Sequence, residues 1–459
     1  MADSGTNKAK DFNRRDFLKL SAGTGLGLAL GGAVLSGCSS MRQLWPAPAW
    51  PLRTPPKDVI RVGYVGVGSQ GSGHVNNLLK IDGVELTAVC DIRPNRVEWA
   101  QKKCEEAGKP KPKGYGRDDW DFKRMCEVED LDLVYTATPW QWHVPVCVAA
   151  MKAGKHAASE VPAAVTLEEC WELVETSEKT RRHCVMMENC SYDRTELMIL
   201  NMVRKGLFGE LLHAECGYLH DLRALKLNPN GYQGMWRIYH SIKRNGDLYP
   251  THGLGPVAQW MDINRGNQFD YLVSMSCKSR GLKLYAQEHY PDSKWAKQDY
   301  ALGDVVDTLI RTKQGQTILV THDTNTPRPY SRKILLQGTK GIVRKYPEEK
   351  IHIEGRTTGH DWENLDKYLE EYEHPLWKQI EEKAQGAGHG GMDFIEDYRL
   401  IKCLREGLAT DMDVYDAAAI SAVSALSEKS IAHKSRSVDF PDFTRGKWKT
   451  NAPLGIVEA

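Results

Sequence analysis

The sequence predicts an α/β domain built on a doubly wound parallel sheet, followed by an α+β domain with an open, mostly antiparallel sheet. Three observations support this architecture. The chain has 459 residues, which is too long for one ordinary hydrophobic core, so two domains are expected. Apolar β runs alternate with helical segments up to about residue 195. From about Leu207 the alternation gives way to a series of strands, as in an α+β domain.

The first β run, 59–65, leads into a glycine-rich turn at 66–71 and then into a predicted helix over 73–81. The second run, 84–90, ends at Asp91, 20 residues after the last glycine of the turn. A glycine turn between strand and helix, with an acidic residue at this distance, is typical of a dinucleotide-binding Rossmann domain. The turn residues expected to contact the cofactor are Gly66, Gly68, Ser69, Gln70 and Gly71.

Each part of this turn has a physical task. Gly68 allows the backbone to approach a pyrophosphate, Gly71 allows close packing of helix on strand, and the helix N-terminus offers free N–H groups. Asp91 can accept hydrogen bonds from ribose hydroxyls and repel a 2′-phosphate, which favours NAD over NADP. Arg93, two residues further on, could soften that repulsion. NAD is therefore the expected cofactor.

Further strands and helices follow in alternation. The strands are expected at 131–137, 155–159 and 183–187, and the helices at 143–153 and 166–178. The second of these helices opens with a capping box from Thr166 to Glu169. Because the carboxyl ends of parallel strands line one crevice, the residues after these strands should gather near the nicotinamide. They are Trp140, Gln141, Trp142, His143, Glu160 and Asn189.

The second domain is expected to contain one open sheet and two C-terminal helices. Its strands are predicted at 211–218, 271–276, 305–310 and 317–322, and its helices at 393–406 and 414–427. The second helix should pack back on the first domain, and the sheet should face the nicotinamide. The exposed face of an open sheet could mediate a homodimer.

The N-terminus resembles an export signal. Arg14 and Arg15 are followed by Phe-Leu-Lys and by a Gly/Ala-rich apolar run over 20–35, and the segment ends in Leu-Ser-Gly-Cys38. This pattern is similar to a twin-arginine signal joined to a lipoprotein cleavage box, in which Cys38 becomes the lipidated first residue. The run is too short and too rich in glycine for a membrane-spanning helix. We therefore expect export by the twin-arginine route to the periplasm or cell envelope, with membrane contact through the lipid anchor alone.

These boundaries divide the chain into five parts. They are a signal at 1–37, a tether at 38–57, the NAD-binding domain at 58–195, the substrate domain at 196–445 and a tail at 446–459.

The formal net charge of +1 gives no electrostatic reason to expect nucleic acid as a partner. The 11 cysteines form no CxxC pair and no zinc-spaced Cys/His cluster, so neither a metal site nor a disulfide scaffold is expected. Most of them lie in apolar runs, which favours buried free thiols.

Longer motifs give a more specific resemblance. They include Trp-Gln-Trp-His at 140–143, Asn-Gly-Asp-Leu-Tyr-Pro-Thr-His-Gly at 245–253 and Gly-Ala-Gly-His-Gly-Gly-Met-Asp at 386–393, within matching stretches from about 59 to 445. The first half resembles the Gfo/Idh/MocA oxidoreductase family. The chain as a whole is similar to glycoside hydrolase family 109, the NAD-dependent α-N-acetylgalactosaminidases.

Two departures from the parent oxidoreductases support the hydrolase subgroup. The parent dehydrogenases usually carry Glu-Lys-Pro with a catalytic lysine, whereas this chain has Glu160-Val161-Pro162. They also tend to place an aspartate four residues before an active-site histidine, where this chain has Leu248 before His252. Both losses argue against a standard sugar dehydrogenase, and the resemblance implies that the hydrolase subgroup shares them.

The resemblance implies a redox-neutral hydrolysis of terminal α-N-acetylgalactosaminides. NAD+ takes a hydride from C3 of the sugar, a base removes the C2 proton, the aglycone leaves C1 by elimination, water adds, and the hydride returns. The family's catalytic positions fall on Tyr249 and His252, and which of them takes which proton stays open. Val161 joins the cofactor-binding residues. The implied substrate-binding residues are Tyr218, Arg237, Tyr249, Pro250, Thr251, His252 and Tyr330.

The sequence alone leaves other functions open. One is a net NAD-dependent sugar oxidoreductase, and another is a glycosidase with a different hexosaminide or anomer preference. A third is a non-catalytic sugar-sensing protein that kept the fold. His220 and His389 are also near the motifs, but no catalytic role is assigned to them.

Overall fold

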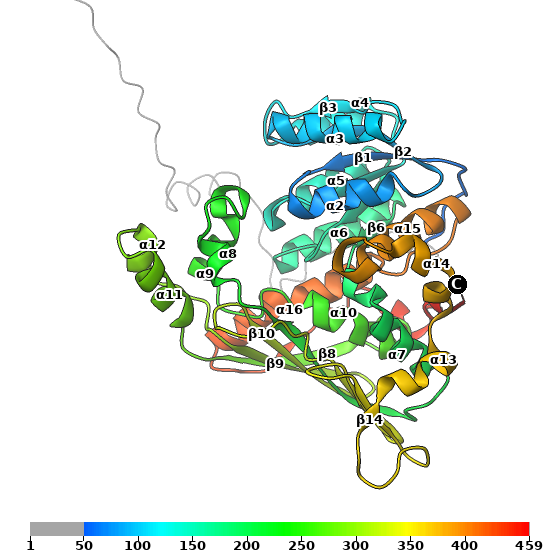
Figure 1. Ribbon diagram of the computed structural model, residues 1–459, viewed down its shortest axis with the longest axis vertical. Helices are drawn as coiled ribbons and strands as arrows, with labels where there is room; N and C mark the ends of the chain where they lie inside the picture. The colour runs from blue at the N-terminus through cyan, green and yellow to red at the C-terminus, as the bar shows by residue number, and fades with distance from the viewer. Residues whose placement is uncertain (1–49, 459) are drawn as a thin grey trace, which may run out of the picture. The chain divides into compact units, whose positions relative to one another are not determined.

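The computed structural model describes residues 50–458, which form one compact unit (Figure 1). The signal at 1–37, the lipidation site Cys38 and the tether up to residue 49 lie outside the described residues. The described part contains two sheets, as the sequence predicts. One is a six-stranded parallel sheet with the order β3-β2-β1-β4-β5-β6, and the other is a nine-stranded mixed sheet.

The first sheet is the predicted Rossmann-type sheet, and all of its strand pairs are parallel. Its strands are β1 (Ile60–Val65), β2 (Val84–Cys90), β3 (Lys113–Tyr115), β4 (Leu133–Thr136), β5 (His156–Ser159) and β6 (Cys184–Met186). The helices between them are α2 (Ser69–Leu78), α3 (Pro94–Glu106), α4 (Asp121–Val128), α5 (His143–Lys152) and α6 (Leu167–Thr180). Helix α2 begins earlier than predicted, and the capping box at Thr166 is confirmed.

The second sheet has the strand order β14-β13-β12-β11-β7-β10-β9-β8-β15. Only β7 and β10 pair in parallel, and the other pairs are antiparallel. Its strands are β7 (Leu211–Leu219), β8 (Phe269–Ser276), β9 (Val306–Thr312), β10 (Thr317–Asp323), β11 (Leu335–Gly338), β12 (Gly341–Arg344), β13 (Lys350–Ile353), β14 (Glu363–Asn364) and β15 (Val438–Asp439). The four predicted strands are confirmed, and β11–β14 extend the sheet beyond them.

Two C-terminal helices connect the sheets, and Figure 1 shows α16 between them. The remaining helices are α7 (Arg194–Arg204), α8 (Arg223–Leu227), α9 (Trp236–Lys243), α10 (Thr251–Trp260), α11 (Gly281–His289), α12 (Lys294–Lys297), α13 (Leu369–Tyr372), α14 (Pro375–Ala384), α15 (Met392–Glu406) and α16 (Val414–Ala432). The Ser421 hydroxyl of α16 accepts from the backbone N–H of Ala163 in the first domain. Ser430, further along α16, accepts from the N–H of Ser274 in β8. Helix α16 therefore packs on both domains, and α15 packs against α2.

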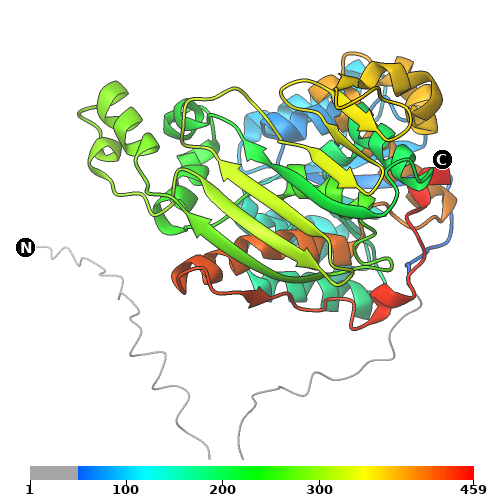
Figure 2. The same cartoon turned by 90° about the horizontal axis from the view of Figure 1, so that it is seen from below.

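The outer face of the second sheet is uncovered by helices in Figure 2. Tyr271, Met275 and Leu309 of this sheet are exposed, and the open sheet is the surface suggested from the sequence for a homodimer. The predicted domain boundary after residue 195 falls inside α7, and the predicted tail from 446 packs Leu454 and Ile456 into buried positions.

Among residues 50–458, no helix is both long and apolar enough to cross a membrane. Within the same range the cysteines are free, and they are buried except for Cys277.

Candidate active site

A cavity of about 450 Å³ lies where the carboxyl ends of the first sheet meet the second domain. It is lined from both sides by residues that the sequence predicts. These are Gly66, Gly68, Ser69, Gln70, Asp91, Trp140, Trp142, His143, Glu160, Val161, Asn189, Tyr218, Arg237, Tyr249 and His252. The predicted cofactor positions and the predicted catalytic positions thus open on one space.

The glycine turn has the geometry of an anion site. Gly66 has a φ of +87°, a left-handed conformation that favours glycine. A Cβ at Gly71 would collide with the carbonyl oxygen of Gly66, so the predicted close packing of helix on strand is confirmed. Helix α2 starts at Ser69 with no acidic residue in its first turn. Its free N–H groups and positive dipole end therefore face the cavity, as a pyrophosphate requires.

Asp91 is fixed at the end of β2. Its Oδ2 accepts from the N–H of Val67 at 2.8 Å, and its Oδ1 accepts from the N–H of Arg93 at 2.9 Å. The Arg93 side chain is about one-third exposed, with its Nε 3.4 Å from the same carboxylate. This buried, oriented carboxylate fits the hydroxyls of a ribose, and Arg93 lies beside it as expected.

An aromatic and cationic wall, made of Trp140 from the first domain and of Arg237 and Tyr249 from the second, lines the cavity. Trp140 and Tyr249 stack with ring centroids 5.5 Å apart and planes 20° apart. The buried guanidinium of Arg237 lies 4.8 Å from each of these ring centroids and donates to the Tyr232 hydroxyl at 2.5 Å. Such a wall offers both a flat apolar surface and hydrogen-bond donors, which together suit a sugar.

Tyr249 and His252 lie next to each other at the start of α10, with ring centroids 4.9 Å apart. Tyr218 from β7 lies 4.7 Å from Tyr249 and 5.4 Å from His252, measured between centroids. Burial raises the pKa of Tyr249 well above its usual value, although Arg237 opposes the shift. Burial also raises the pKa of Tyr218 to about 12. Both phenols therefore carry their protons at neutral pH.

His252 occupies the first turn of α10, and Pro250 is the N-cap residue of this helix. The glycines of this segment serve close packing. A Cβ at Gly253 would collide with the backbone of Gly217 in β7, so glycine lets the helix lie directly on the strand. This contact places His252 beside Tyr218.

A buried carboxylate orients His252. Oε1 of Glu188 lies 2.8 Å from Nδ1 of His252, and the Glu188 side chain is fully buried. The N–H of Cys190 donates to the same oxygen at 3.0 Å. Nδ1 is therefore the donor to Glu188, which leaves Nε2 for the cavity. Glu188 was not among the predicted site residues, although it stands directly before the predicted Asn189.

Some predicted residues lie outside the cavity lining. Gln141 is exposed, and Thr251 is buried inside the first turn of α10. Tyr330 is 39% exposed, with its ring centroid 6.2 Å from that of Tyr218. Nδ1 of His220 lies 2.9 Å from the Tyr218 hydroxyl, so His220 contacts a residue of the cavity lining.

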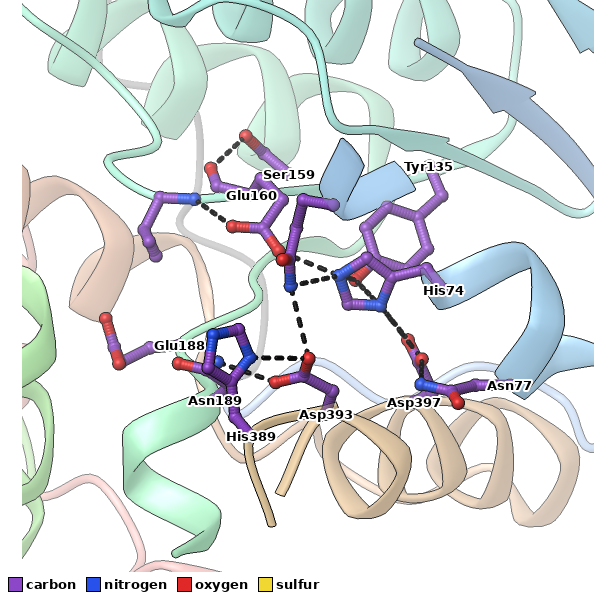
Figure 3. A network of polar contacts seen from close by, with 12 residues as sticks. His74, Asn77, Tyr135, Ser159, Glu160, Glu188, Asn189, His389, Asp393 and Asp397 are labelled. Atoms are coloured by element: carbon purple, nitrogen blue, oxygen red, sulfur yellow. Dashed lines mark hydrogen bonds and ion pairs between the residues drawn. The ribbon is translucent and has the colours of Figure 1, made fainter. Parts of the chain in front are cut away.

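The glycine-rich stretch before α15 brings His389 into the lining. Its Nδ1 lies 2.8 Å from Oδ2 of Asp393, and Oδ1 of Asp393 accepts from the Asn189 amide at 2.7 Å (Figure 3). Hydrogen bonding to Asp393 raises the pKa of His389. His389, to which the sequence assigned no catalytic role, thus adds a side chain to the cavity lining.

Family models cover most of the described chain. Residues 192–450 match the model described as Glycosyl hydrolase 109, C-terminal domain, and residues 60–188 match the oxidoreductase family with an NAD-binding Rossmann fold. Residues 11–31 match the twin-arginine translocation pathway signal sequence. The expected NAD cofactor and twin-arginine signal are confirmed by these matches.

Curated relatives match along their whole length. A glycosyl hydrolase family 109 protein from Shewanella pealeana is 46% identical over 452 residues, covering 97% of this chain and 99% of the relative. A protein from Shewanella oneidensis named alpha-N-acetylgalactosaminidase is 46% identical over 458 residues, covering 98% and 100%.

Solved structures share the fold. Levoglucosan dehydrogenase in complex with NADH and L-sorbose superposes with a TM-score of 0.63 at 20% identity, over 84% of this chain and 100% of that one. An inositol dehydrogenase homologue from Azotobacter vinelandii, complexed with NADH and myo-inositol, gives 0.63 and 20% over 84% and 98%. At this identity the likeness establishes the two-domain architecture.

Proposed function

This chain belongs to glycosyl hydrolase family 109, and from that premise we propose that it hydrolyses terminal α-N-acetylgalactosaminides with the help of retained NAD. One observation carries the proposal. The dinucleotide turn at 66–71 and the pair Tyr249 and His252 open on the same cavity, while Val161 stands where the related dehydrogenases carry a catalytic lysine. A relative at 46% identity bears the name alpha-N-acetylgalactosaminidase, which supports this substrate class.

When bound in this cavity, NAD+ supplies a hydride acceptor for C3 of the sugar, and the resulting ketone makes the C2 proton acidic. The chain's own task is then to move protons and hold the sugar. His252 presents Nε2 to the cavity, with Glu188 behind it to stabilise the imidazolium, so we assign His252 as the base. Tyr249 keeps its phenol proton at neutral pH, so we assign it as a hydrogen-bond donor to the sugar.

The aromatic and cationic wall, to which both domains contribute, would hold the substrate. Trp140 and Tyr249 provide stacked rings, and Arg237 lies over both with donors for sugar oxygens. Such an arrangement binds a ring of the substrate without supplying a general-acid carboxylate pair. Ordinary glycosidases need that pair, and oxidation at C3 removes the need.

We further propose that the mature protein is a lipoprotein. The twin-arginine match at 11–31 is followed by Leu-Ser-Gly-Cys38, the pattern of a lipoprotein cleavage box. Export in the folded state would let the cofactor be bound before the protein leaves the cytoplasm. Mass spectrometry of the mature N-terminus would test this directly, because a lipidated cysteine should be its first residue.

The activity is tested with an aryl α-N-acetylgalactosaminide and purified protein, without added cofactor. Release of the aglycone with no lasting rise in absorbance at 340 nm supports redox-neutral hydrolysis. One NADH formed per sugar would instead support the net oxidoreductase. An aryl β-N-acetylgalactosaminide and an aryl α-N-acetylglucosaminide serve as matched substrates, because they differ only in the anomer or at C4.

A further inference from the structure

A fully buried histidine lies behind the cofactor side of the cavity. His74 is on α2, one helical turn after the glycine turn, and both of its ring nitrogens meet carboxylates (Figure 3). Nε2 lies 2.8 Å from Oε1 of Glu160, and Nδ1 lies 2.9 Å from Oδ2 of Asp397. Glu160 follows β5, while Asp397 is on α15. The histidine therefore links the first sheet to a helix from the far end of the sequence.

The contacts around His74 leave it little freedom. The Tyr135 hydroxyl lies 3.1 Å from Nδ1, and the Asn77 amide donates to Oδ2 of Asp397 at 3.0 Å. Burial alone would lower the pKa of His74, but Asp397 and Glu160 outweigh it and raise the pKa well above its usual value. With a carboxylate at each nitrogen, the imidazolium form donates in both directions.

Among the three hydrogen-bonded residues Asp397, His74 and Glu160, it is Glu160 that lines the cavity. Its Oε2 accepts from the N–H of Val161 at 3.1 Å, and its Oε1 faces His74. The arrangement repeats that of Asp91. Each is a carboxylate after a parallel strand, held by a backbone N–H and a cationic side chain, which is Arg93 for Asp91 and His74 for Glu160.

A dinucleotide contains two riboses, one at each end of its pyrophosphate. Asp91, at the end of β2, fits the adenosine ribose. Strand β5 lies on the opposite side of β1 in the sheet, beyond β4, so the carboxylate at its end lies on the other side of the glycine turn. Glu160 also shares this region of the lining with Asn189 and Val161. On this side of the glycine turn, the ribose next to the nicotinamide is the part of the dinucleotide with a pair of hydroxyls that can donate to the Glu160 carboxylate.

Glu160 is already among the residues predicted to lie near the nicotinamide. We propose that His74 is the positioning residue that holds the Glu160 carboxylate toward the hydroxyls of the ribose next to the nicotinamide, and that Asp397 anchors His74. Helix α15 is then part of the cofactor site, although it is remote in sequence. Binding of the dinucleotide does not depend on the proposed hydrolysis, so nucleotide titrations test the role of His74 without any glycoside substrate.

The test compares three nucleotides in isothermal titration of full-length protein stripped of cofactor. NADH and ADP-ribose contain the second ribose, whereas ADP lacks it. His74→Phe is expected to weaken the binding of NADH and ADP-ribose about 10- to 100-fold, because Glu160 loses the charged hydrogen bond from His74 that positions it. The affinity for ADP should not change. His74→Gln keeps a donor toward Glu160 and should lose less, and it also serves if the Phe variant does not fold.

Asp91→Asn is the matched control, because the adenosine ribose is common to all three ligands. It should weaken NADH, ADP-ribose and ADP together. Selective loss of NADH and ADP-ribose in the His74 variants supports the proposal. Wild-type affinity for NADH in either His74 variant, or a loss of ADP affinity as large as the loss of NADH affinity, overturns it.

Discussion

Glu188 and His252 form a carboxylate–imidazole pair across the two domains, with Oε1 2.8 Å from Nδ1. The related dehydrogenase pattern would place an aspartate at Leu248, four residues before the histidine. This chain draws its carboxylate from the end of β6 in the first domain instead. The base proposed for the sugar is thereby fixed to the sheet that holds the cofactor.

Replacing Glu188 by glutamine should lower kcat and leave KM nearly unchanged. The amide keeps the shape and can still accept from Nδ1, but it no longer stabilises the imidazolium that forms when His252 takes a proton. We expect a loss of about 10²-fold, within the range for general acid–base groups. Steady-state kinetics and the NAD content of the purified variant measure this. Wild-type kcat with normal NAD content would remove Glu188 from the mechanism.

Tyr249→Phe and His252→Asn should each abolish most hydrolysis while the cofactor stays bound. The expected loss in kcat is about 10²- to 10⁴-fold, because one variant removes the hydrogen-bond donor to the sugar and the other removes the base. His433→Asn is the control, since His433 is an exposed histidine at the end of α16. Aglycone release is measured together with NAD content. Unimpaired turnover in both active-site variants would refute the site assignment.

Arg237→Lys should raise KM about tenfold with a smaller effect on kcat. Lysine keeps the charge, but it cannot lie flat over Trp140 and Tyr249 with a guanidinium's donors. Arg356→Lys, at an exposed arginine paired with Glu371, provides the comparison. Equal KM values in these two variants would mean that Arg237 does not contact the substrate.

Asp247→Asn should change how stability depends on pH. Asp247 is fully buried, and burial raises the pKa of its carboxyl to about 7. The unfolded carboxyl ionises near pH ~3.9, so between these values only the folded state holds the proton, and stability falls as pH rises. Asparagine carries no such cost. Its Tm should match that of the wild type near pH 4 and exceed it by a few degrees above pH 7.

Thermal unfolding of both proteins at pH 4, 6 and 8, at one ionic strength, measures this difference. A gap in Tm that stays constant across the three pH values would show that Asp247 is not the titrating group.

Much of the cofactor side could be predicted because it depends on local pattern. The carboxyl ends of parallel strands meet at one edge, so Asp91, Glu160 and Asn189 could be placed beside the glycine turn before any coordinates were known. The four-residue strands β11–β13 were not predicted, because segments this short carry little periodicity.

The long-range pairs could not be predicted from the sequence. Glu188 and His252 are 64 positions apart, and His74 and Asp397 are 323 apart, so no spacing rule connects them. Helix α10 was not predicted, because its segment contains two glycines and Pro256, which are unfavourable inside helices. Those glycines are explained only by the strand backbone that the helix contacts, which is a tertiary feature.

Removal and return of the cofactor test the central claim most directly. Protein stripped of nucleotide should release no aglycone from an aryl α-N-acetylgalactosaminide. One equivalent of NAD+ should restore the full rate, and the amount of NAD+ should be unchanged after many turnovers. Full activity of the stripped protein would contradict the account, because hydrolysis would then not need NAD+. One NADH formed for each aglycone released would also contradict it, because the reaction would then not be redox-neutral.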